Sequence, residues 1–231
     1  MTEPLIFLPG MMCDARLFLP QIAALSGNIS ITVMPLQGHR TMADLAKRVL
    51  AKAPPYFALA GLSMGGIVAM EIVRQAPQRV TRLALLDTNP LADSADKAPL
   101  RQAQVKRVLQ GELHAVMRDE LKPNYLASGP DQQHILTLCM QMAETLGPKV
   151  FEDQSCAIQH RPDQCEALRS VTVPSLVLCG KEDRLCPVSR HELMHELIPG
   201  SRLAVIANAG HLPTLEQPDL TNRILKEWLR L

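Results

Sequence analysis

The chain has 231 residues, and its 24 Lys and Arg against 23 Asp and Glu give a formal net charge of +1. This length suits one domain, or one domain that carries an inserted subdomain. The balanced charge, with no basic stripe, argues against a nucleic-acid partner. No apolar run reaches the roughly 18 residues of a membrane span, and no secretory signal is visible at the N-terminus. We therefore expect a cytoplasmic protein without a membrane partner, whose six cysteines are reduced thiols.

Short apolar runs typical of β-strands recur along the chain and are separated by helix-type stretches. These runs cover residues 5–8, 29–34, 56–60, 81–86, 172–179 and 202–206. Several are apolar on consecutive positions, which indicates strands that are covered on both faces. The pattern predicts an α/β fold with a mostly parallel, doubly wound sheet of about six strands.

The β-type rhythm stops between the fourth and fifth of these runs. Helical patterns take its place at residues 100–109, 112–121, 132–146 and 149–159, with breaks at Pro123, Gly129-Pro130 and Gly147-Pro148. The simplest interpretation is a helical insertion at residues 88–170 that forms a cap. Residues 1–87 and 171–231 would then build the core domain.

The most informative motif is Gly61-Leu62-Ser63-Met64-Gly65, which lies where an apolar strand gives way to a helix predicted from about residue 64 to 75. So tight a turn needs small residues on both sides of the serine. A serine hydroxyl is a poor nucleophile near neutral pH, so it needs a base within hydrogen-bond reach and a third group that orients the base.

Two later loops offer these partners. Asp183 follows the fifth predicted strand and His211 follows the sixth, so both lie at the same carboxyl edge of the sheet as Ser63. The order of the three residues is that of one particular serine hydrolase architecture.

On these motifs the whole chain resembles the α/β-hydrolase superfamily. The resemblance implies that Ser63, Asp183 and His211 are catalytic, and that the backbone N–H groups of Met11 and Met64 form the oxyanion hole. Many relatives have a histidine where this chain has Pro9, before Gly10. The side chain of Met12 would line the substrate site beside these donors. No cofactor or metal is implied.

We expect a carboxylic ester hydrolase that cleaves a small or medium, largely apolar substrate through an acyl-enzyme. The same residues would serve a thioesterase, a lactonase or a C–C bond hydrolase. A non-catalytic ligand-binding protein on the same fold is the alternative of another class. The oligomeric state is left as monomer or homodimer.

Other residues compete for these roles. Asp87, after the fourth predicted strand, and Glu182 are rival acids for His211. His191-Glu192-Leu193-Met194-His195 matches a zinc-peptidase motif, for which Glu216 is a possible third ligand. A solvated helix is the favoured interpretation of that segment. The glycine-rich turn lacks the Lys and Ser/Thr that end a phosphate-binding loop.

Overall fold

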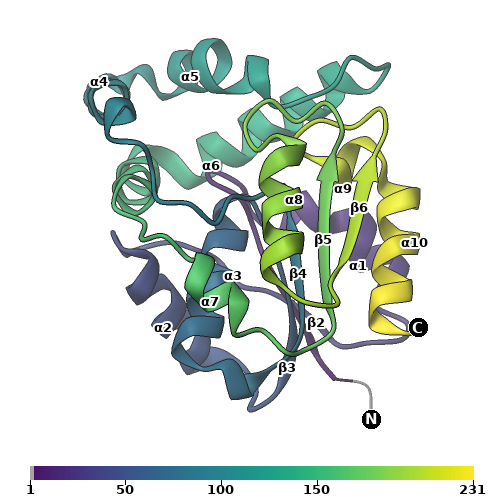
Figure 1. Cartoon of the computed structure of the whole chain (residues 1–231). Coiled ribbons are helices and arrows are strands. Elements are labelled where there is room, and N and C mark those ends of the chain that lie inside the picture. The colour runs from purple at the N-terminus through teal and green to yellow at the C-terminus, as the bar shows by residue number, and fades with distance from the viewer. Residues whose placement is uncertain (1–2) are drawn as a thin grey trace.

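The computed structural model describes residues 3–231 and contains a six-stranded, entirely parallel sheet (Figure 1). The strands are β1 (Leu5–Leu8), β2 (Ile31–Val33), β3 (Phe57–Leu62), β4 (Val80–Leu86), β5 (Ser175–Gly180) and β6 (Arg202–Ile206). They lie in the order β2-β1-β3-β4-β5-β6. The prediction of a doubly wound α/β fold with six strands is confirmed.

Helices cover both faces of this sheet. The α-helices are α1 (Leu19–Leu25), α2 (Met42–Lys52), α3 (Met64–Gln75), α4 (Ala98–Arg107), α5 (Leu113–Val116), α6 (Gln132–Gln159), α7 (Cys165–Arg169), α8 (Val188–Leu197), α9 (Pro213–Glu216) and α10 (Pro218–Leu229). Helices α1 and α10 pack together on one face, and α2, α3, α7 and α8 lie on the other (Figure 1). None of the helices in residues 3–231 is both long enough and apolar enough to cross a bilayer.

Alternating residues of the strands supply the two sides of the core. Ile6 and Leu8 of β1 pack in the cluster that contains α2 and α3, whereas Leu5 and Phe7 pack in the cluster that contains α1 and α10. All four are fully buried. This accounts for strands that are apolar on consecutive positions, because each residue faces a covered side of the sheet.

The strand boundaries differ from the predicted ones for local reasons. Strand β5 begins at Ser175 and not at residue 172, because Pro174 has no N–H to donate to the sheet. The carbonyl of Pro174 instead accepts a hydrogen bond from the N–H of Leu83. Strand β3 continues to Leu62, directly before Ser63.

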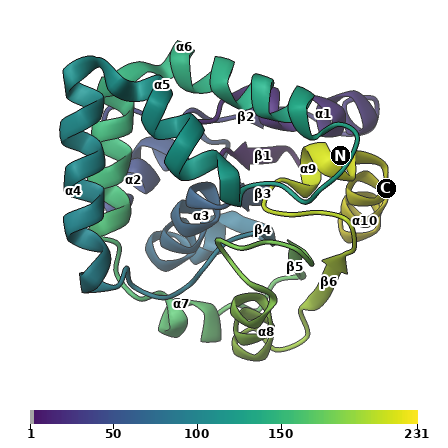
Figure 2. The ribbon, with the colours of Figure 1, turned by 90° about the horizontal axis from the view of Figure 1, so that it is seen from above.

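Between β4 and β5 the chain forms helices only, and α4, α5 and α6 lie above the carboxyl ends of the strands (Figures 1 and 2). The predicted break in α6 is a kink, since Gly147 has φ 78° and ψ 177°. Helix α7 packs against α3 and α8 beside the sheet, although it falls inside the predicted cap. The boundaries of the cap at residues 88 and 170 stay predictions.

Candidate functional site

Ser63 occupies a strained turn between β3 and α3. Its backbone has φ 54° and ψ −117°, a region that non-glycine residues rarely adopt and that is typical of functional sites. The turn is held from β4: the N–H of Ser63 donates to the carbonyl of Leu86 (2.9 Å), and the hydroxyl of Thr88 donates to the carbonyl of Ser63 (2.7 Å). The hydroxyl of Ser63 is therefore presented by a fixed backbone at the carboxyl edge of the sheet.

The glycines on either side of Ser63 are required by close backbone contacts. A Cβ atom on Gly61 would lie within 3.0 Å of the backbone of Gly65, and one on Gly65 would lie within 3.0 Å of the carbonyls of Leu8 and Pro9. Real Cβ atoms do not approach backbone so closely, so only glycine fits at both positions. The prediction that this turn needs small residues rested on the same physical reason.

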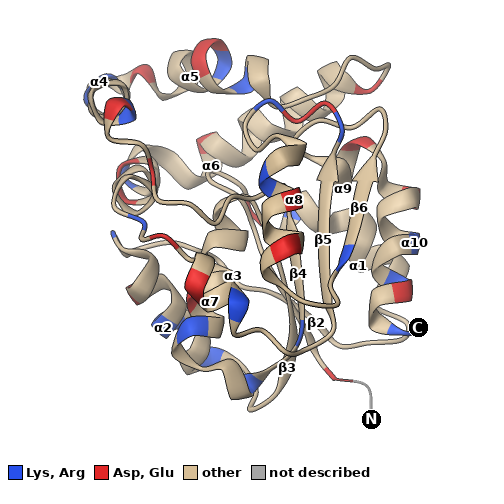
Figure 3. Cartoon of the chain, viewed as in Figure 1, with Lys and Arg blue, Asp and Glu red and all other residues tan. Residues whose placement is uncertain are grey.

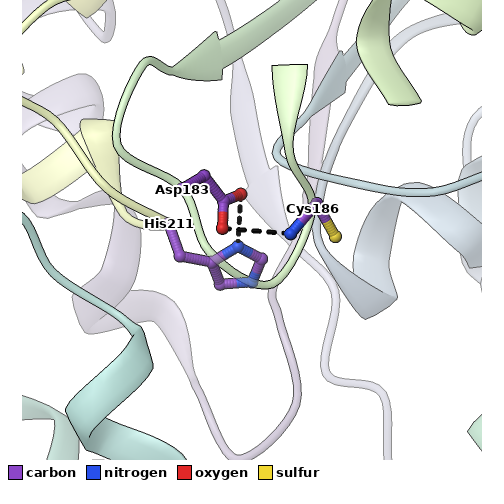
Figure 4. A group of neighbouring side chains, drawn as sticks. All are labelled: Asp183, Cys186 and His211. Carbon is purple, nitrogen blue, oxygen red and sulfur yellow. Dashed lines mark hydrogen bonds and ion pairs between the residues drawn. The ribbon is translucent and has the colours of Figure 1, made fainter. Parts of the chain in front are cut away.

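Asp183 and His211 form a buried hydrogen-bonded pair (Figure 4). The Nδ1 atom of His211 lies 2.8 Å from Oδ2 of Asp183, and the two residues are only 2% and 5% exposed. Burial acts to raise the pKa of Asp183, but His211 and the N–H groups of Cys186 and Leu185 outweigh it and hold the pKa below the ordinary value. Asp183 is thus a carboxylate that fixes His211 with its Nδ1 proton toward Asp183 and its Nε2 atom free.

The carboxylate of Glu216, which the sequence analysis named as a possible third zinc ligand, holds the loop around His211 in place. It accepts hydrogen bonds from the N–H groups of Gly210 (2.9 Å), Leu212 (2.9 Å) and Ala127 (2.7 Å). These contacts hold both neighbours of His211 and join them to the segment that precedes α6. Burial raises the pKa of Glu216 despite the three donors.

Ser63 and the Asp183–His211 pair lie at the same edge of the sheet. Backbone hydrogen bonds link this edge from strand to strand, from Ser63 to Leu86, from Asp87 to Leu178, and from Lys181 to Ile206. The hydroxyl of Ser63 makes no hydrogen bond to His211 within residues 3–231. Such contacts are often long in ligand-free enzymes and tighten when substrate binds.

The loop after β1 lies against Ser63. A Cβ atom on Gly10 would be 3.4 Å from the Cβ atom of Ser63. In the described part of the chain the N–H groups of Met11 and Met64 donate to no acceptor, and their role in an oxyanion hole stays a prediction. The Met12 N–H, by contrast, donates to Oε1 of Gln154 (2.8 Å).

Gln154 makes two buried hydrogen bonds near the site that the sequence did not indicate. It is 2% exposed on α6, and its Nε2 donates to the carbonyl of Leu36 (2.8 Å), so it ties the loop after β1 to the loop after β2. The side chain of Met12 is fully buried among residues of α6 and the helices before it. No local motif marks Gln154, because its partners lie more than a hundred residues away.

The rival acids have other contacts. Asp87 is fully buried and its Oδ1 accepts the N–H of Gly180 (2.8 Å), but it makes no hydrogen bond to His211. Burial, and then the charge of Asp183, raise its pKa well above the ordinary value. Glu182 accepts the N–H of Ala209 (3.1 Å). Of the three carboxyl groups, only that of Asp183 contacts His211.

The two histidines of the zinc-peptidase motif on α8 make contacts within the protein core and its edge. The Nε2 atom of His191 accepts the N–H of Thr88 (3.0 Å), and its Nδ1 lies 3.3 Å from the carbonyl of Pro187. Burial lowers the pKa of His191 to about 4, so the ring is neutral. His195 instead contacts the hydroxyl of Ser201 (2.8 Å). His191 is therefore an internal support for the loop after β4.

Within residues 3–231, the one close group of three potential metal-binding side chains is Asp183, Cys186 and His211, whose ligand atoms all lie within 4.8 Å of one another. Two of these already share a hydrogen bond, and burial raises the pKa of the Cys186 thiol.

Comparisons with known proteins show the family to which the chain belongs. The model of the alpha/beta hydrolase family matches residues 5–224, so the chain belongs to this family. A pimeloyl-[acyl-carrier protein] methyl ester esterase of Pectobacterium carotovorum is 28% identical, over 93% of this chain and 89% of its own.

Two solved structures extend the comparison. A thermophilic esterase from Thermogutta terrifontis superposes with a TM-score of 0.88 at 27% identity, covering 99% of this chain and 89% of that one. An enol-lactonase from Burkholderia xenovorans shares the fold, with a TM-score of 0.87 at 20% identity over 100% and 93% of the two chains. The prediction of an ester hydrolase agrees with the activity that the esterases' names give.

Proposed function

We propose that the protein is a carboxylic ester hydrolase with Ser63 as nucleophile, His211 as general base and acid, and Asp183 as the group that orients His211. The buried hydrogen bond between Asp183 and His211, at the same sheet edge as the strained Ser63, is the observation that carries this proposal. The free Nε2 atom of His211 is the base that this arrangement offers to Ser63.

The reaction would run through an acyl-enzyme. The Oγ atom of Ser63 attacks the ester carbonyl while Nε2 of His211 takes its proton, and the N–H groups of Met11 and Met64 donate to the oxyanion. His211 then protonates the leaving alcohol. Water repeats the cycle on the acyl-enzyme and releases the carboxylic acid. Asp183 stabilises the imidazolium that forms in each half of the reaction.

A largely apolar acyl group suits the surroundings of the two donors. Met11 and Met12 pack with Val108, Met117 and Phe151 in an apolar cluster formed with the helices above the sheet. The name of the Pectobacterium relative makes the methyl ester of an acyl chain the first substrate to test. Thioesters, lactones and C–C substrates remain the alternatives, and the helices of residues 88–170 would act as the cap that selects among them.

Location and assembly belong to the same proposal. A cytoplasmic location is consistent with the six free cysteines in the structure. The assembly, monomer or homodimer, stays a prediction. Lys and Arg are interspersed with Asp and Glu along the ribbon in Figure 3, and the formal net charge is only +1, which favours a small-molecule substrate over a nucleic acid.

The proposal is tested with matched methyl esters, aryl esters and thioesters of acyl chains with two, four, six and eight carbons. We expect saturable turnover of the esters, with kcat/KM highest at one intermediate length. Turnover of thioesters alone would replace the function by a thioesterase. Binding of the acyl chains without turnover of either series would support the ligand-binding alternative.

A further inference from the structure

Asp87 has one carboxyl oxygen that no other group in the described part of the chain satisfies. The residue directly follows β4 and is fully buried, and its Oδ1 accepts the N–H of Gly180 (2.8 Å). Its Oδ2 is inaccessible and makes no hydrogen bond within residues 3–231. A carboxylate removed from water with one oxygen unsatisfied is costly, so this oxygen requires either a donor or a proton of its own.

The carboxyl group of Asp183 is the neighbour that could accept such a proton. Gly180 links the two residues, because its N–H donates to Asp87 and its carbonyl accepts the N–H of Asp183 (3.4 Å). The two acidic side chains lie within hydrogen-bond reach of one another. Two carboxylates offer acceptors only, so a hydrogen bond between them forms only when one of them carries a proton.

The donors around the two acids decide which one carries the proton. Asp183 accepts three hydrogen bonds, from Nδ1 of His211 (2.8 Å) and from the N–H groups of Leu185 (2.8 Å) and Cys186 (3.1 Å). Asp87 accepts only that of Gly180. Donors stabilise the charged form of a carboxyl group, and a second negative charge nearby opposes it. The proton therefore belongs on Asp87, in agreement with the raised pKa of Asp87 and the lowered pKa of Asp183.

Other titratable groups also face this pair and the imidazole. They are Cys179 on β5, Cys186 in the loop after β5, Tyr125 before α6, His191 on α8 and Glu216 on α9. Burial raises the pKa of the two thiols, of Tyr125 and of Glu216, and it lowers that of His191. Burial thus favours the neutral form of every one of them, which leaves Asp183 as the charge that Asp87 meets.

We propose that Asp87 is a positioning residue that, as a neutral acid, donates a hydrogen bond from Oδ2 to the carboxylate of Asp183. This fourth donor disperses the negative charge of Asp183 and fixes its carboxylate toward His211. Asp87 would act on the reaction only through Asp183. The catalytic role of His211 rests on the proposed function, whereas the hydrogen bond between the two acids does not.

Asparagine is the matched control at this position. Asp87 has φ 42°, in the left-handed region that asparagine adopts more readily than most side chains. The amide of Asp87→Asn keeps an acceptor for the N–H of Gly180 and a donor for Asp183. Asp87→Leu has neither.

The first test is infrared spectroscopy and needs no catalysis. The difference spectrum between the wild type and Asp87→Asn at pH 7.5 isolates the carbonyl stretch of a protonated acid at residue 87 from any at Glu216. We expect this band in the wild type. We expect it to move in Asp183→Asn, measured against the double variant, because an amide is a weaker acceptor than a carboxylate. A carboxylate signal instead of the acid band would overturn the proposal, and so would a band that Asp183→Asn leaves unmoved.

The second test compares the pH dependence of kcat/KM in the wild type, Asp87→Asn and Asp87→Leu. Without the donor, Asp183 should hold the proton on His211 more strongly, so Asp87→Leu should move the acid limb up by about half a pH unit to one unit. Asp87→Asn should leave the limb in place. A downward move in both variants would mean that Asp87 is a carboxylate. A lower kcat in Asp87→Leu with an unmoved limb would mean a packing role, and either result would overturn the inference.

The two tests fail independently. If the wild type hydrolyses no ester, the proposed function fails, and the infrared experiment alone decides whether Asp87 donates to Asp183. Thermal melting checks that each variant is folded. If Asp87→Leu does not fold, the infrared comparison still decides, since it uses asparagine variants only.

Discussion

The carboxyl groups of Asp87 and Asp183 follow two adjacent parallel strands and are both buried, yet only Asp183 contacts His211. Their pKa values are displaced in opposite directions. Burial and the charge of Asp183 raise that of Asp87, whereas His211 and backbone N–H groups overcome burial and lower that of Asp183. The surroundings thus favour the neutral form of Asp87 and the charged form of Asp183, which separates their roles.

This separation predicts different effects of the same substitution. Asp183→Asn should lower kcat by about 10³- to 10⁴-fold, because the amide cannot stabilise the imidazolium and favours the wrong tautomer of His211. Asp87→Asn should change kcat by less than about tenfold, since asparagine resembles the neutral acid and can still accept the N–H of Gly180. Steady-state kinetics on one aryl ester at pH 7.5 decides. If kcat fell as much in Asp87→Asn as in Asp183→Asn, the assignment of Asp183 as the catalytic acid would be wrong.

The tight packing around Ser63 predicts a stability effect. Gly65→Ala should destabilise the fold by about 3 kcal/mol, because its Cβ would meet the carbonyls of Leu8 and Pro9. Gly129→Ala is the matched control, as nothing lies within 4 Å of a Cβ there. Urea unfolding of the two variants measures the difference, and equal midpoints would contradict the packing described here.

Because His191 is buried, we expect the free energy of unfolding to depend on pH. Its pKa is about 4 in the folded protein against 6.5 as the reference value, so the folded state holds the ring neutral. The stability that this neutral ring contributes is complete above pH 6.5 and is lost as pH falls toward 4, because the unfolded chain takes up the proton first. The loss amounts to about 3 kcal/mol.

The measurement is urea unfolding at pH 7.5, 5.5 and 4.5 for the wild type and His191→Gln, whose amide oxygen can accept the N–H of Thr88. We expect the wild type to lose more stability than the variant over this range. Parallel pH profiles would mean that His191 titrates alike in the folded and unfolded states.

The sequence predicts the sheet well because its strands are buried on both faces and are marked by consecutive apolar residues. It also places Ser63, Asp183 and His211 at one edge, since each follows a parallel strand. The strand pattern alone does not choose between Asp87 and Asp183, because both follow buried strands and only their contacts differ; the prediction of Asp183 came from the family resemblance. The same holds for Gln154, whose importance comes from its burial and from partners distant in the chain.

The zinc-peptidase motif is a case in which the sequence pattern indicates a site, but the side chains make other contacts. His191 and His195 have the spacing of metal ligands, but one is turned to the backbone of Thr88 and the other to Ser201. Spacing on a helix fixes which side chains share a face and not what that face packs against. Tertiary contacts therefore decide between the two interpretations.

The central claim is that Ser63, served by His211, is the nucleophile. Its most direct test compares hydrolysis of a short-chain aryl ester by the wild type and by Ser63→Ala, with enzyme purified in the same way. We expect the substitution to lower kcat on the order of 10⁶-fold, as for the loss of one member of a unit that acts together. Equal rates for the two proteins would contradict the account.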